Sequence, residues 1–146
     1  MEDLATAKAR LLAKVEGYAP GQAVRFTPAL DELIRWSEEN GLRFAPHAGV
    51  HHLVKFCVPG RSAPFWAATP RTGDGCKLTL LADPRFPEPL RTVARTELAR
   101  IDWKPVKPDG PPEVAFTKLI WPPHRAAVLA LMTQLLAEIA VPATAV

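Results

Sequence analysis

The chain has 146 residues, a net charge of +3 and a hydrophobic fraction of 48%. This length suffices for one domain with its own core, so the fold does not depend on disulfides or metal ions. The charge permits binding to phosphates without requiring it. Residues 126–132, the longest apolar run, are too few to cross a bilayer, and the acidic N-terminus lacks a signal-peptide pattern. We therefore expect a cytoplasmic protein without a membrane partner.

The first 24 residues predict a peripheral helix followed by a linker. Apolar residues over 2–16 fall on one side of a helix, but its many alanines leave little to bury. We place a single α+β domain over 25–146.

A second helix is predicted to begin at Thr27 and to end at Asn40. Thr27 is a suitable N-cap, and Pro28 suits the first helical position. Asn40 and Gly41 supply the left-handed stop.

Residues 51–81 predict an antiparallel meander. Runs rich in β-branched and aromatic residues lie at 51–58, 65–69 and 76–81, and clusters of proline and glycine separate them. The alternation of apolar and polar residues is imperfect, which indicates that both faces of the sheet are partly covered.

The remainder of the chain predicts a helix, a strand and a final helix. The third helix covers 87–101, a proline-rich loop covers 102–112, and a fourth strand covers 113–121. The last helix begins at Pro122 and stops before Pro142. The order α-α-β-β-β-α-β-α predicts an α+β fold, with helices packed on an antiparallel sheet of at least four strands.

Basic and aromatic residues are interleaved along the meander and the third helix. Such a surface would hold phosphates with its cations and stack bases on Trp66. Arg91 and Arg95 lie one helical turn apart and are expected to face outward. The alternative is a solvated charged rim around a core that contains the aromatic rings. The predicted nucleic-acid-binding residues are Lys55, Arg61, Trp66, Arg71, Lys77, Arg91 and Arg95.

Histidine and cysteine residues raise the question of a zinc site. His47, His51, His52, Cys57 and Cys76 have suitable ligand chemistry, but their spacing matches no zinc motif. We predict no metal and no cofactor. Two cysteines in a chain of this size do not make a disulfide framework.

Acidic residues suggest two further hypotheses. Glu97 falls inside the apolar arc of the third helix, where it would act as a general acid or, as we favour, lie at the edge of the arc and pair with Arg100 or with a lysine of the sheet. Asp83, followed later by Asp102 and Lys104, loosely matches a metal-dependent nuclease pattern. Such spacing arises by chance in most proteins.

Several segments together resemble the MmcQ/YjbR group of small bacterial proteins. The resembling segments are the strands at 53–58 and 65–69, residues 75–84 with the arginine-bearing helix that follows, and the closing strand and helix. The resemblance implies an antiparallel sheet flanked by helices and an activity in DNA binding. It assigns no role to an individual residue.

These observations favour a non-enzymatic module that binds nucleic acid or another acidic partner. One alternative is a small hydrolase or ligand-binding enzyme with a pocket between sheet and helices, in which Glu97, His51 or His52 titrates. Another is a self-associating protein that buries Trp66 or Trp121 in a homodimer interface.

Overall fold

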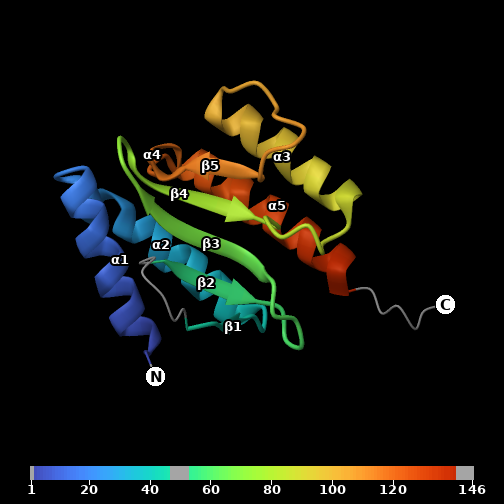
Figure 1. The fold of residues 1–146 in the computed structure, drawn as a ribbon, viewed down its shortest axis with the longest axis horizontal. Coiled ribbons are helices and arrows are strands. Elements are labelled where there is room, and N and C mark those ends of the chain that lie inside the picture. The colour runs from blue at the N-terminus through green and yellow to red at the C-terminus, as the bar shows by residue number, and fades with distance from the viewer. Residues whose placement is uncertain (1, 47–52, 141–146) are drawn as a thin grey trace.

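The computed structural model describes residues 2–46 and 53–140 and has an α+β fold (Figure 1). It confirms the predicted class and the antiparallel sheet, which has five strands. The helices are α1 (Leu4–Tyr18), α2 (Gln22–Glu39), α3 (Glu88–Asp102), α4 (Phe116–Leu119) and α5 (Pro122–Ala140). The strands are β1 (Arg43–Phe44), β2 (Val54–Cys57), β3 (Pro64–Arg71), β4 (Gly75–Leu80) and β5 (Glu113–Ala115).

The sheet follows chain order, and each strand is antiparallel to its neighbours. Val54, Ala68, Leu78 and Val114 lie opposite one another in successive strands, and all four are fully buried. Residues directly opposite in an antiparallel pair share a face, so these side chains form the inner surface of the sheet. In Figure 1, α2 and α5 lie behind β2, β3 and β4. The core is thus mainly between one sheet face and the helices.

Helix α1 belongs to this core, contrary to the peripheral position expected for residues 1–24. Ala7, Leu11 and Val15 are buried in the same cluster as the inner face of the sheet. At Gly75 a Cβ atom would lie only 3.2 Å from the Val15 side chain, and the backbone φ is +99°. Small residues and this glycine therefore let the helix approach the β3–β4 hairpin closely.

Helix α2 begins at Gln22, so the predicted start at Thr27 is wrong. Pro28 lies inside the helix, although proline removes one backbone hydrogen bond there. The Thr27 hydroxyl donates to the Ala23 carbonyl oxygen at 2.8 Å. Phe26 is buried and its ring lies 5.7 Å from that of Phe116 in α4. This packing keeps the turn before the proline helical.

The predicted strand at 113–121 is also wrong beyond its third residue. Strand β5 ends at Ala115, and α4 follows immediately. Phe116 and Leu119 are both buried, and their separation of three residues fits one turn of helix. Burial of this pair outweighs the alternating pattern that suggested a strand.

Trp66 occupies the centre of the core and joins the sheet to α2. Its indole Nε1 donates to the Ser37 hydroxyl oxygen at 2.6 Å, and this hydroxyl donates to the Leu33 carbonyl oxygen at 2.7 Å. The ring stacks on Phe56 with centroids 5.2 Å apart. The preceding residue, Phe65, stacks on Trp36 of α2. A register shift between Phe56 and Cys57 lies at this part of the sheet.

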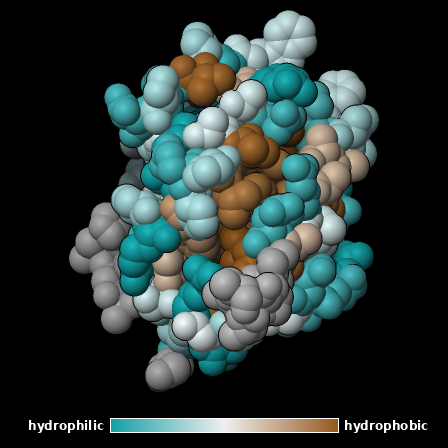
Figure 2. Space-filling view, turned by 90° about the vertical axis from the view of Figure 1, so that its right-hand side faces the viewer, coloured by the Kyte–Doolittle hydropathy of each residue, from teal (hydrophilic) through white to brown (hydrophobic). Residues whose placement is uncertain are grey.

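The side of the molecule where α3 begins and α5 ends has an apolar area in its middle, surrounded by hydrophilic side chains (Figure 2). The partly buried residues Leu90, Leu136 and Ile139 of these helices pack against the core. Despite such residues, none of the helices within 2–46 and 53–140 has the length and apolar character needed to span a membrane.

The bond between Trp66 and Ser37 yields a stability prediction. We expect Ser37→Ala to lower the free energy of unfolding by about 1–3 kcal/mol, because it leaves a buried indole N–H without an acceptor. Thr133→Ala is the matched control, since Thr133 accepts from Trp36 Nε1 at 3.1 Å in an exposed pair that water can replace. Urea denaturation measures both. Equal losses for the two variants would contradict the role given to the buried bond.

Candidate nucleic-acid interface

The outer face of the sheet collects basic side chains. Lys55 lies opposite Ala67 across β2 and β3, and Thr79 lies opposite both Ala67 and Glu113. Lys77 lies opposite Thr69 and Ala115 in the same way. Because side chains alternate along a strand, all of these point away from the inner surface. We call the residues Arg43, Lys55, Ala67, Thr69, Arg71, Lys77, Thr79 and Glu113 the outer sheet face.

This face carries four cations, Arg43, Lys55, Arg71 and Lys77, and one carboxylate, Glu113. In Figure 1, no helix of the described part of the chain crosses in front of β2, β3 and β4. The small residues Ala67, Thr69 and Thr79 separate the long basic side chains. The face is therefore positively charged and shallow enough for an extended anionic chain.

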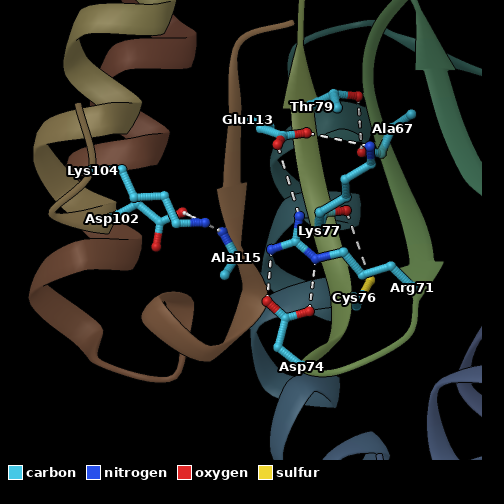
Figure 3. A network of polar contacts seen from close by, with 10 residues as sticks. All are labelled: Ala67, Arg71, Asp74, Cys76, Lys77, Thr79, Asp102, Lys104, Glu113 and Ala115. Carbon is cyan, nitrogen blue, oxygen red and sulfur yellow. Dashed lines mark hydrogen bonds and ion pairs between the residues drawn. The ribbon is translucent and has the colours of Figure 1, made fainter. Parts of the chain in front are cut away.

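Glu113 joins the cations at the β4–β5 side into a network (Figure 3). Its carboxylate lies 3.3 Å from Lys77 Nζ and 3.8 Å from Arg71 Nη1. Arg71 also donates two hydrogen bonds to Asp74, at 2.7 and 2.6 Å. These bonds raise the pKa of Arg71 above its ordinary value. Lys77 and Arg71 are thus held in place and partly neutralised.

Arg43 and Lys55 differ, since neither forms an ion pair with any residue in 2–46 or 53–140. Arg43 is exposed and Lys55 half-buried. Burial raises the pKa of the Cys57 thiol, and the positive charges of the nearby Lys55 and Arg43 oppose this rise. A hollow of about 380 Å³ beside Arg43 has a lining that includes Phe44, Cys57, Arg61 and Ser62.

Arg61 continues this basic region into the β2–β3 turn. It is exposed, makes no ion pair with the described residues, and its guanidinium lies 5.9 Å from the centre of the Phe86 ring. A second hollow, of about 200 Å³, shares Arg61 and Ser62 with the first and adds Arg85. Arg85 is held by Asp83, and this contact lowers the pKa of Asp83 to about 2.

Three of the seven predicted binding residues lie inside the protein. Trp66 is fully buried and cannot stack on a base. Arg91 donates to the Leu81 carbonyl oxygen at 2.9 Å, and Arg95 donates to the Gly110 carbonyl oxygen at 2.6 Å. Both arginines also pair with Glu88. The expectation that Arg91 and Arg95 face outward is wrong, because loop carbonyls bind their head groups against α3.

Of the other four, Arg61 is exposed, and Lys55, Arg71 and Lys77 are half-buried; Arg71 and Lys77 are also held in ion pairs. The sequence reasoning missed Arg43, since the two-residue strand β1 was not foreseen. The signal that was available is Gly41, which ends α2 and turns the chain toward the sheet.

This geometry gives little support to the hypotheses of a general acid at Glu97 and of a metal-dependent nuclease site. Glu97 is partly exposed and lies 3.2 Å from Arg100, which confirms the predicted pairing. Asp83 precedes α3 and Asp102 ends it, so about 20 Å of helix separates the two nuclease candidates. No three potential metal ligands cluster within the described residues. His47, His51 and His52 lie outside the part of the chain that the structure describes.

The two thiols are poor nucleophiles in this fold. Cys57 and Cys76 are both free and buried. Burial raises the pKa of both thiols, and the effect is larger for Cys76, which lies on the inner face of the sheet. Neither cysteine therefore has the environment of a catalytic residue.

Comparisons with protein-family models, curated proteins and solved structures find no match to this chain. The resemblance to the MmcQ/YjbR group therefore stays a prediction.

The Glu88 contacts yield a prediction about acid stability. The Arg95 guanidinium lowers the pKa of Glu88 below its ordinary value of 4.5. A carboxylate whose pKa is lower in the folded state than in the unfolded state stabilises the fold fully at a pH above the unfolded-state pKa. This contribution is lost as the pH falls through the folded-state pKa. We expect Glu88→Gln to be less stable near neutral pH and to lose less stability than the wild type on acidification.

Thermal unfolding across the acid range measures this difference. Glu97→Gln is the matched control, because it removes a carboxylate from the same helix whose partner, Arg100, is exposed. Parallel acid profiles for the wild type and Glu88→Gln would show that Glu88 does not anchor the two arginines.

Proposed function

We propose that this protein binds nucleic acid, without catalysing a reaction, through its outer sheet face. The observation that supports the proposal is the cross-strand register, which puts four cations beside one carboxylate on one surface. Phosphates attract such a surface through charge and through the release of their counterions. Arg61 extends the same charge into the β2–β3 turn.

The two ends of this face have different roles in the proposal. At the β1–β2 side, Arg43 and Lys55 have no acidic partner among the described residues, so they bind phosphate without first breaking an ion pair. At the β4–β5 side, Lys77 and Arg71 share Glu113, and Arg71 also pairs with Asp74. Their contribution to phosphate binding is therefore weaker, and it depends on that carboxylate.

The first test removes an unpaired cation. We expect Lys55→Ala and Arg43→Ala each to weaken binding to an oligonucleotide and to reduce the slope of log affinity against log salt by about 0.7 to 0.9. Fluorescence anisotropy over a salt series gives both quantities. Arg35→Ala is the matched control, since Arg35 is exposed on α2, behind the sheet in Figure 1. An equal effect of Arg35→Ala would exclude a defined footprint on this face.

The second test removes the carboxylate. We expect Glu113→Gln to tighten binding and to steepen the salt dependence, because Lys77 and Arg71 lose the anion that they share. Glu39→Gln makes the same change of net charge at the exposed end of α2 and should have a smaller effect. Weaker binding by Glu113→Gln would contradict the assignment of phosphate binding to its partners.

A further inference from the structure

Trp103 is exposed in a way that packing does not explain. Its side chain is 85% exposed, the largest fraction among the large hydrophobic residues that the structure describes. It caps the C-terminus of α3 with a φ of 57° and a ψ of 40°, a left-handed conformation usually taken by glycine or asparagine. A large exposed ring on an unfavourable backbone conformation is typical of a ligand-binding position.

The backbone around Trp103 is tied firmly to α3. The N–H of Trp103 donates to carbonyl oxygens of the last helical turn, and the N–H of Lys104 donates to the Ala99 carbonyl oxygen at 3.0 Å. Farther along the loop, Arg95 holds the Gly110 carbonyl oxygen. The indole is therefore presented on a constrained support, so little backbone freedom is lost when a ligand stacks on it.

A hollow of about 150 Å³ lies beside this turn and connects it with the outer sheet face. Its lining includes Arg95, Asp102, Lys104, Lys107 and Glu113. Glu113 is the residue that pairs with Lys77 and Arg71 on the sheet, and Figure 3 shows Lys104 and Asp102 on the other side of β5 from them. Three cations and two carboxylates thus line the hollow between the sheet and the loop that bears Trp103.

Arg95 gives the hollow an unused donor. Its side chain is only 6% exposed, its Nε binds Gly110 and its Nη1 binds Glu88. Its Nη2 group donates to no residue in the described part of the chain. Nη2 is not among the fully buried unpartnered atoms of the described residues, so it is open to the hollow and can donate to an oxygen or nitrogen acceptor of a ligand there.

We infer that the nucleic acid bound by this protein is single-stranded, with an unpaired base stacked on Trp103. The inference rests on the proposed function and names its ligand class. An exposed indole stacks on a base of any sequence, while Lys107 holds an adjoining phosphate and Lys104, which pairs with Asp102 at 3.5 Å, contributes less. In a duplex the faces of the bases are already stacked on one another, so only an unpaired strand offers them to the ring.

The test compares a labelled oligodeoxythymidine strand with its duplex by fluorescence anisotropy. We expect the wild type to bind the single strand more tightly, and Trp103→Ala to weaken that binding by about 5- to 100-fold without weakening duplex binding. Trp103→Phe should keep most of the affinity, because phenylalanine also stacks. Trp103→Asn, which suits the left-handed backbone, should lose as much affinity as Trp103→Ala if stacking is the cause.

Trp121→Ala is the matched control, since Trp121 is 66% exposed just before α5, whereas Trp103 stands between Asp102 and Lys104, which both line the hollow. We expect it to change the affinity by less than about twofold, as for an exposed site without contacts. Equal binding of strand and duplex, or an unchanged affinity in both Trp103→Ala and Trp103→Asn, would overturn the inference. If Lys55→Ala still reduced the salt slope in that case, the basic face would stand as a binding surface. Absence of binding to either oligonucleotide would refute both proposals.

Discussion

Burial of one face of the five-stranded sheet is the constraint on which the rest of this structure depends. The register aligns Val54, Ala68, Leu78 and Val114 across four strands, so a single apolar surface forms. Such a surface is stable only when helices cover it, and apolar residues of α1, α2, α4 and α5 share its core cluster. Trp66 also fixes how α2 lies against the sheet, because its indole N–H donates to a single acceptor on that helix, the Ser37 hydroxyl. The polar residues that alternate with these apolar residues along the strands must then point away from the core.

The class of fold follows from pattern, whereas several boundaries depend on packing. Turn residues and apolar periodicity suffice for the hairpins, for α3 and for α5. They fail at Pro28, where burial of Phe26 keeps a helix going through a proline, and at Phe116, where packing of its ring on Phe26 and burial of Leu119 favour a turn of helix. In both places a contact between residues 90 positions apart decides a local conformation, and a reading of nearby sequence does not contain that contact.

The sequence predicted that a basic surface exists, but it identified only some of the residues that form it. Lys55 could be placed on a strand and Arg61 in a turn from sequence alone, because both follow simple alternation and turn patterns. Arg91 and Arg95 could not, since a helical wheel shows direction but not the loop that closes over it. The carbonyl oxygens of Leu81 and Gly110 come from loops on either side of α3, and they turn two apparent surface cations into buried donors.

The same two arginines explain how the basic face and Trp103 come to be fixed relative to each other. Glu88 holds both guanidinium groups on one side of α3, Arg91 ties that helix to the end of β4, and Arg95 ties it to the loop before β5. Asp102 then accepts a hydrogen bond from the backbone N–H of Ala115 in β5. The last turn of α3 is therefore anchored to the sheet edge that carries Glu113. A ligand that contacts both the sheet and the indole would meet two parts of one rigid support, so it would lose little affinity to rearrangement of the protein.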